Sequence, residues 1–194
     1  MNLKKLVTAA VCTMLMAAVA FTAGCGGEKK SDKKVLKVGM ECAYAPYNWS
    51  QTKADGGAVK IAGSNEYAYG YDVMMAKKLA DSMGADLEIH KIEWDGLAPA
   101  VVSGKIDAAI AGMSITSKRK ETVDFTKPYY YATVVALVKK DSEQAKAQSV
   151  ADLKGSVATS QLNTIWYDQI DQVPDVKKLP AIDTVPGMIV ALTS

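Results

Sequence analysis

Apolar and polar residues alternate along the chain in patterns that predict strands from residue 35 onward. Val35 to Met40 has the period of two expected of a strand, and Leu87 to Ile92 is predicted as a second strand. Ile106 to Ala111 is almost continuously apolar, as in a strand that is covered on both faces. Further short strands are predicted at 130–138, 157–159 and 176–180.

Helical periodicity fills the intervals between these strands. Tyr71 to Met83 gathers its apolar residues on one face and meets a stop signal at Gly84; the face consists of Val73, Ala76, Ala80 and Met83. Other helices are predicted at 94–103, 117–122, 163–170 and 185–192. Strands that alternate with helices predict an α/β fold with mainly parallel sheets.

Two segments depart from this alternation. Residues 50–70 are polar and rich in Gly and Ala, which is typical of a long loop or a loose hairpin. After Lys140 the chain becomes polar, and Ser149 and Asp152 then have the spacing of a helix capping box. We therefore predict one unit at 35–140 and a second at 141–194, which is too short to bury a core of its own.

The first 24 residues are predicted to be a signal peptide rather than part of the fold. Two lysines precede an uncharged run from Leu6 to Phe21, which is shorter than the roughly 20 residues that span a membrane. A membrane-anchoring helix and ordinary secretion with cleavage nearby are the alternatives. Residues 25–34 contain almost only Gly, Lys, Glu, Ser and Asp, and are predicted to form a flexible tether.

The end of this signal resembles the lipobox of bacterial lipoproteins. Thr22-Ala23-Gly24-Cys25 has the small residues and the cysteine of that motif, although Thr22 stands where an aliphatic residue is usual. The resemblance implies that Cys25 carries acyl chains such as palmitate and anchors the protein to the outer face of the membrane.

Composition narrows the possible functions. The formal net charge is +2, and removal of residues 1–24 would take away two lysines and leave equal numbers of basic and acidic side chains. A neutral domain gives no electrostatic reason to expect nucleic acid as a partner. With a single histidine, His90, and with Cys42 expected to be a small buried apolar residue, no metal site, cofactor site or Ser–His catalytic pair is predicted.

Four stretches, in this order, resemble the polar amino-acid-binding proteins of ABC transporters: 38–47, 70–80, 94–107 and 111–130. The resemblance implies a two-lobed, periplasmic-binding-protein-like α/β fold, with lobe 1 at 35–140 and an incomplete lobe 2 at 141–194. It implies an extracytoplasmic, non-enzymatic component of an importer that binds a free polar or cationic L-amino acid between its lobes. The expected partners are that amino acid, the ABC transporter permease subunits and the membrane.

Arg119 is the strongest candidate for the site on chemical grounds. A guanidinium matches a carboxylate with two parallel hydrogen bonds. Arg119 follows the predicted strand 106–111 at the start of a predicted helix, for which Thr116 is the expected N-cap. A solvated arginine in the basic run 118–120 is the alternative.

The resemblance assigns roles to further residues of the first lobe. Arg119 and Ser114 would hold the α-carboxylate, and the Gly112 carbonyl and the Ser114 hydroxyl would accept from the α-ammonium. Tyr44 and Trp94 would enclose the aliphatic part of the ligand.

At two more positions the resemblance concerns the ligand's side chain and the second lobe. Glu41 would face the ligand side chain and favour a cation or an amide, with a surface carboxylate as the alternative. Thr164 would add a hydroxyl and an N–H to the carboxylate site. The family's acidic residue for the ammonium is expected beyond Ser194, so we expect weak binding or a fragment of a longer protein.

Two other functions stay open at this point. One is an enzyme on the same fold, similar to cyclohexadienyl dehydratase, with acid–base chemistry from Glu41, Glu93 or Asp95. The other is the sensory domain of a receptor.

Overall fold

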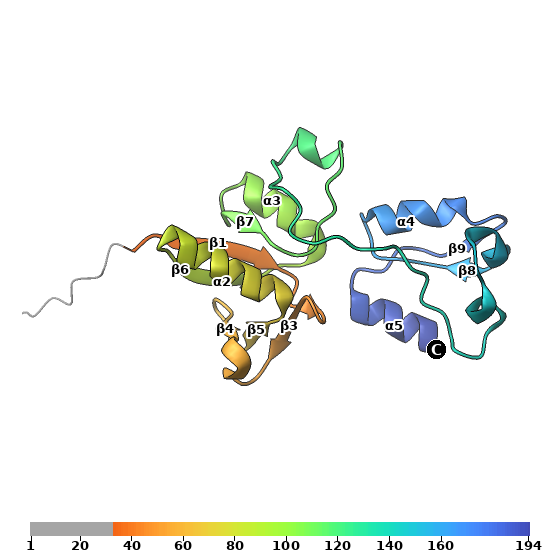
Figure 1. Ribbon diagram of the computed structural model, residues 1–194, viewed down its shortest axis with the longest axis horizontal. Helices are drawn as coiled ribbons and strands as arrows, with labels where there is room; N and C mark the ends of the chain where they lie inside the picture. The colour runs from red at the N-terminus through yellow and green to blue at the C-terminus, as the bar shows by residue number, and fades with distance from the viewer. Residues whose placement is uncertain (1–32) are drawn as a thin grey trace, which may run out of the picture. The chain divides into compact units, whose positions relative to one another are not determined.

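The computed structural model describes residues 33–194 (Figure 1). The predicted signal peptide, the predicted lipid site Cys25 and most of the tether lie outside the described residues. Within 33–194, none of the helices combines the length and the apolar character that crossing a membrane requires.

A three-stranded parallel sheet forms the first layer. Its order is β6 (Asp86–Lys91), β1 (Val35–Met40) and β7 (Ala108–Ala109), so that β1 lies in the middle. Val38 pairs with Ile89 on one side and with Ala108 on the other. Val38 and Ile89 are completely buried, as expected for a sheet covered on both faces.

Two helices cover this sheet. α2 (Tyr71–Met83) contacts β1 and β6, and α3 (Leu97–Val102) contacts β1 and β7. Val73, Ala76 and Ala80 of α2 are buried, as predicted. Met83 was expected on the same face, but its side chain is exposed, because it ends the helix immediately before Gly84 turns the chain in a left-handed conformation.

Residues 43–69 form a small antiparallel sheet, so that of the two structures expected for this segment, loop or hairpin, the hairpin is the one observed. Its order is β2 (Ala43–Tyr44), β3 (Asn48–Gln51), β5 (Tyr67–Tyr69) and β4 (Val59–Lys60). Gly70 follows β5 with a φ of 127°, a conformation that side chains disfavour, and starts α2.

The remainder of the chain contains a second, two-stranded parallel sheet. β8 (Val157–Ala158) pairs with β9 (Lys177–Lys178), and the helices are α4 (Ile165–Gln169) and α5 (Val185–Thr193). The capping box predicted at Ser149 and Asp152 is confirmed. Short 3₁₀ turns complete the chain at 55–57, 94–96, 119–121, 143–146, 150–153 and 170–172.

Several predicted elements are absent or reduced. Of the strands expected at 106–111, 157–159 and 176–180, only the two-residue strands β7, β8 and β9 form. The strand expected at 130–138 does not form, and Tyr131 and Val135 are 83% and 81% exposed. Within 33–194 no partner strand offers its backbone to this apolar run, and an unpaired strand has no ladder of hydrogen bonds. The helix expected at 117–122 is a 3₁₀ turn of three residues, Arg119–Glu121.

The boundary predicted near residue 140 is not visible as a division into compact units, since 33–194 is a single one. It stays a prediction, together with the boundaries at residues 24 and 34.

Candidate ligand-binding site

A cavity of about 160 Å³ is lined by loops that follow the parallel strands, by the tyrosine-rich segment at 129–132, and by α4 and α5. One water needs roughly 10–15 Å³ of such space, so the cavity has room for a small organic molecule. The residues that line it are Glu41, Tyr44, Tyr47, Asp72, Trp94, Ala111, Gly112, Tyr129, Tyr130, Ala132, Gln161, Thr164, Trp166, Val185 and Met188.

Five of the seven residues predicted from the sequence lie on this cavity, namely Glu41, Tyr44, Trp94, Gly112 and Thr164. Ser114 and Arg119 are not part of its lining. Ser114 nevertheless contacts Arg119 directly, and Arg119 contacts Trp94. The structure thus brings the predicted set together, while the role of each member in binding stays a prediction.

Glu41 directly follows β1 and carries a buried carboxylate. Its Oε1 accepts a hydrogen bond of 2.8 Å from the Gln161 amide. Burial raises the pKa of Glu41, the Gln161 bond opposes this shift, and the nearby Glu93 and Asp95 add to it. None of the cationic side chains in 33–194 forms an ion pair with Glu41.

Arg119 uses part of its guanidinium to bind backbone carbonyls. Nη1 donates to the Ser114 carbonyl at 2.7 Å and Nη2 to the Asn163 carbonyl at 2.9 Å, and Cζ lies 5.4 Å from the centre of the Trp94 ring. Burial lowers its pKa, but a guanidinium keeps its charge near neutral pH. Because a guanidinium has five N–H groups, three are available beyond these two bonds.

Thr116, the expected N-cap, binds the Arg119 backbone, although the 3₁₀ turn that forms has Lys118 at its N-cap position. Thr116 Oγ1 accepts from the Arg119 backbone N–H at 3.1 Å. The backbone around Arg119 is therefore fixed from Thr116, and its side chain is fixed from Ser114 and Asn163.

Tyrosines form one wall of the cavity. The ring centres of Tyr44 and Tyr47 are 4.9 Å apart, those of Tyr47 and Tyr130 are 5.3 Å apart, and the Tyr47 and Tyr130 hydroxyls are 3.1 Å apart. Their hydrogen bond raises the pKa of Tyr47 to about 12, so Tyr47 is uncharged at neutral pH. Such faces suit the aliphatic stem or the cationic end of a ligand.

Thr164, which is predicted to contribute a hydroxyl and an N–H to the carboxylate site, also caps a helix. Its hydroxyl donates to the Gln161 carbonyl at 2.7 Å and accepts from the Tyr167 N–H at 3.3 Å, so it caps the N-terminus of α4. The hydroxyl hydrogen is therefore already used within the protein.

Asp72 is the main cavity residue that the sequence analysis missed. An aspartate in the first turn of a helix is favourable there for its own sake, so its position in α2 gave no signal of a site. Its carboxylate is completely buried, and burial raises its pKa against the hydrogen bonds from Asn48 and Tyr129. Tyr129 and Tyr130, at the end of the stretch 111–130, were also missed, and so was Gln161, which lies outside the four stretches.

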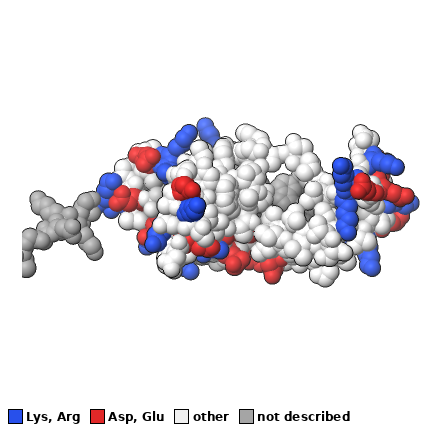
Figure 2. Space-filling view, turned by 90° about the horizontal axis from the view of Figure 1, so that it is seen from below, with Lys and Arg blue, Asp and Glu red and all other residues white. Residues whose placement is uncertain are grey.

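Charge elsewhere is mixed. On the face shown in Figure 2, basic and acidic side chains intermingle without an extensive patch of one sign. Among residues 33–194, no group of three or more His, Cys, Asp or Glu side chains could hold a metal ion.

Comparison with known proteins agrees with this picture. The sequence profile of the bacterial extracellular solute-binding proteins, family 3, matches residues 36–178. The arginine-binding extracellular protein ArtP of Bacillus subtilis (strain 168) is 33% identical over 140 residues, which are 72% of this chain and 49% of ArtP. The ABC transporter arginine-binding protein 1 of Escherichia coli (strain K12) is 32% identical over 176 residues, or 90% of this chain and 61% of that protein.

Among solved structures, the ancestral amino acid-binding protein AncCDT-1, a precursor of cyclohexadienyl dehydratase, superposes with a TM-score of 0.68. It is 31% identical, and the match covers 82% of this chain and 65% of that one. The predicted two-lobed α/β fold class is confirmed by these matches. The chain spans about half to three fifths of the length of the two curated relatives.

Proposed function

Because the chain belongs to the bacterial extracellular solute-binding proteins, family 3, we propose that it binds a free polar or cationic L-amino acid outside the cytoplasm and delivers it to an ABC importer. The observation that carries the proposal is the buried Glu41 carboxylate, which faces a cavity lined by tyrosine and tryptophan.

The electrostatics of the cavity favour a ligand that brings positive charge. Glu41 and Asp72 are both buried there, and neither pairs with a cationic side chain of the described residues. A buried carboxylate without a counter-charge is unfavourable, because it loses its hydration without recovering it from a partner. An ammonium or guanidinium of the ligand would supply the missing partner.

The opposite end of an amino acid is its α-carboxylate, and Arg119 is the candidate for it. The N–H groups that Ser114 and Asn163 leave available can form charge-assisted bonds, which are typically worth about 1.5–3 kcal/mol. Trp94 connects the cavity to Arg119, since it lines the cavity and its ring also contacts the Arg119 guanidinium.

A thermal-shift screen with the twenty L-amino acids tests the function. We expect one or a few cationic or amide amino acids to raise the melting temperature. A hundredfold excess over Kd corresponds to about 2.7 kcal/mol of stabilisation. Absence of a response to all twenty would reject amino-acid binding, and a response to acidic amino acids alone would reject the role of Glu41.

The lipid anchor belongs to the same proposal. Anchoring through Cys25 would keep the protein near the permease, because acyl chains on one cysteine partition stably into the membrane. Metabolic labelling with radioactive palmitate in a bacterial host should mark the wild-type chain and not Cys25→Ser, which should leave the membrane fraction. Equal labelling of both would reject this anchor.

Binding without catalysis is proposed as well. The two curated relatives are named as binding proteins, whereas AncCDT-1 is named as the precursor of a dehydratase. Incubation with prephenate and detection of phenylpyruvate by its absorbance distinguishes the two. We expect no product above the uncatalysed rate.

A further inference from the structure

Two buried hydrogen bonds hold the Asp72 carboxylate. Asn48 Nδ2 donates to Oδ2 at 2.7 Å, and the Tyr129 hydroxyl donates to Oδ1 at 2.9 Å. Asp72 and Asn48 are both completely buried. The carboxylate therefore joins β3, which contains Asn48, to the segment that contains Tyr129.

The Asn48 branch leads to the loop that presents Glu41. Asn48 Oδ1 accepts from the Cys42 backbone N–H at 2.8 Å. Cys42 has a φ of 55°, a left-handed conformation that is uncommon for a residue with a side chain. The orientation of the Asn48 amide follows from its partners, because the N–H of Cys42 needs an acceptor and the carboxylate of Asp72 needs a donor.

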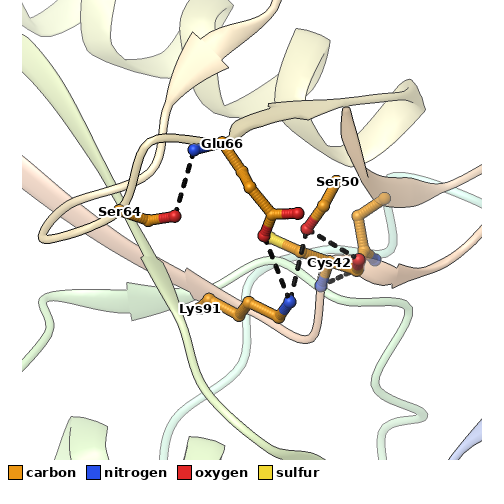
Figure 3. A network of polar contacts seen from close by, with 6 residues as sticks. Cys42, Ser50, Ser64, Glu66 and Lys91 are labelled. Atoms are coloured by element: carbon orange, nitrogen blue, oxygen red, sulfur yellow. Dashed lines mark hydrogen bonds and ion pairs between the residues drawn. The ribbon is translucent and has the colours of Figure 1, made fainter. Parts of the chain in front are cut away.

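The other side of Cys42 is held as well. Its carbonyl accepts from the Ser50 N–H at 2.9 Å and from the Ser50 hydroxyl at 3.3 Å. Figure 3 shows this arrangement, in which Lys91 Nζ lies 3.4 Å from Ser50 Oγ and 3.6 Å from the Glu66 carboxylate. Both backbone groups of the residue next to Glu41 are thus fixed by β3.

The Tyr129 branch leads to the other predicted contact with the amino acid. The Tyr129 hydroxyl accepts from the Gly112 backbone N–H at 2.9 Å. Gly112 lines the cavity with a φ of 65°, and its carbonyl is the predicted acceptor for the α-ammonium. A single hydroxyl therefore connects Asp72 to the peptide between Ala111 and Gly112, which immediately precedes the peptide that carries this carbonyl.

We propose that Asp72 is a positioning residue that fixes the Glu41 loop and the Gly112 peptide together, through Asn48 and Tyr129, in the geometry that binds the amino acid. The role in binding rests on the proposed function, whereas the coupling between Cys42 and Gly112 does not. Asp72 acts through four hydrogen bonds that connect these two positions, which lie far apart in the sequence.

The chemistry of the chain offers a test that separates hydrogen bonding from charge. In Asp72→Asn, the new NH2 group faces either Asn48 Nδ2, which then loses its acceptor, or Tyr129, whose hydroxyl oxygen then accepts from this group as well as from the Gly112 N–H and no longer donates. In both arrangements the chain loses its ionised acceptor and is weakened. The double variant Asn48→Asp with Asp72→Asn restores every bond. The new carboxylate at position 48 accepts from the Cys42 N–H and from the new amide at position 72, whose oxygen accepts from Tyr129. The double variant thus moves the negative charge from position 72 to position 48 but keeps the hydrogen bonds that connect Cys42 to Tyr129.

Hydrogen exchange of the Cys42 and Gly112 amides in the full chain is the first measurement. We expect Asp72→Asn to accelerate exchange at one or both by about tenfold, since losing one hydrogen bond changes local opening by that order. The double variant should return both amides to within about threefold of wild type. Unchanged exchange in Asp72→Asn, or equally fast exchange in the double variant, would overturn the proposal.

Calorimetric titration with L-arginine and L-glutamine is the second measurement. For whichever of the two binds wild type, we expect Asp72→Asn to weaken the affinity of the folded protein by about tenfold and the double variant to recover it. A purely structural Asp72 would lower the melting temperature and leave this affinity unchanged. If wild type binds neither amino acid, the proposed function fails, while the exchange experiment still decides the coupling.

If Asp72→Asn does not fold, Tyr129→Phe tests the same proposal. It should accelerate exchange at Gly112 alone and leave the Cys42 amide protected. Tyr71→Phe is the matched control, because the Tyr71 and Tyr129 rings stack at 6.1 Å and the Tyr71 hydroxyl reaches only the Tyr129 carbonyl. Equal exchange at Gly112 in both variants would contradict the proposal.

Discussion

The side-chain amide of Gln161 donates a 2.8 Å hydrogen bond to the buried carboxylate of Glu41, 120 residues earlier in the sequence. Gln161 also donates to the Asp183 carbonyl at 2.9 Å, so the amide is held from both sides. A neutral amide satisfies one lone pair of Glu41 but supplies no counter-charge. The carboxylate thus remains able to take up a cation from the ligand.

This relationship predicts a pH dependence of binding. The pKa of Glu41 is raised in the folded protein, so the unliganded protein takes up a proton at a higher pH than an exposed glutamate does. A cationic ligand favours the ionised form, and its affinity should therefore fall as the pH drops through this raised pKa. Calorimetric titration with L-arginine at a series of pH values measures this dependence of the affinity on pH.

Glu41→Gln provides the control for that prediction. It should weaken binding of L-arginine by about tenfold or more at neutral pH and flatten the pH profile. Binding of L-glutamine should change less. A steep profile that persists in Glu41→Gln would assign the dependence to another group.

In the unliganded protein, the raised pKa of Glu41 also makes the stability of the fold depend on pH. Because Glu41 and Asp72 bind protons more tightly in the folded than in the unfolded state, both destabilise the fold at neutral pH and do so less as the pH falls toward their raised pKa values. Other carboxylates oppose this trend at lower pH. The difference in melting temperature between wild type and Glu41→Gln should therefore narrow on mild acidification.

Arg119→Ala should abolish detectable binding and also lower stability. It removes the proposed carboxylate clamp, and it leaves the carbonyls of Ser114 and Asn163 without their donors. Arg119→Lys keeps the positive charge but loses the two parallel N–H donors of the guanidinium. We therefore expect the affinity for the amino acid to fall by about ten- to a hundredfold. Lys120→Ala, which removes an adjacent exposed cation, should behave as wild type in calorimetry.

Intrinsic fluorescence should report ligand binding through two of the three tryptophans. Trp94 and Trp166 line the cavity, whereas Trp49 packs edge-on against Tyr69 with ring centres 5.0 Å apart. Replacement of Trp94 or Trp166 by Phe should diminish the ligand-induced change, and Trp49→Phe should preserve it. A change that disappears only in Trp49→Phe would place the ligand elsewhere.

Gly70→Ala should destabilise the fold strongly. A Cβ at this position would lie within 2.3 Å of the Tyr47 carbonyl oxygen, and the φ of 127° is unfavourable for alanine. We expect a loss of more than about 2 kcal/mol in the free energy of unfolding. Gly63 has a φ of 71°, but the space around a new Cβ is open. For Gly63→Ala, denaturant titration should therefore show a loss of only about 1 kcal/mol in the free energy of unfolding.

Long, strongly patterned segments could be predicted from the sequence, because their own residues determine them. β1 and α2 have the bounds that their periodicity indicates, and the capping box forms at Ser149 and Asp152 as their spacing predicts. The run at 130–138 has the composition of a strand, but a strand also depends on a partner, which its own residues do not reveal.

The site likewise contains residues that could be predicted from the sequence and residues that could not. Glu41, Tyr44 and Trp94 stand in motifs that carry the family resemblance, and they meet at one cavity. Asp72 also lies in such a stretch, 70–80, but neither it nor Gln161 received a role, because their contacts join positions far apart in the chain: Asp72 with Tyr129, and Gln161 with Glu41. Such pairings depend on tertiary structure.

The anchoring of Cys42 has a consequence for redesign of the protein. The loop is fixed by the backbone of Cys42 and by side chains of Asn48 and Ser50, and none of these bonds involves the side chain at position 41. Exchange of Glu41 for another residue therefore removes the bond to Gln161 but none of these backbone supports of the loop, and under the proposed function it alters the chemistry offered to a ligand. Position 41 is accordingly the place to begin when the preference of this protein is to be changed for use as a biosensor.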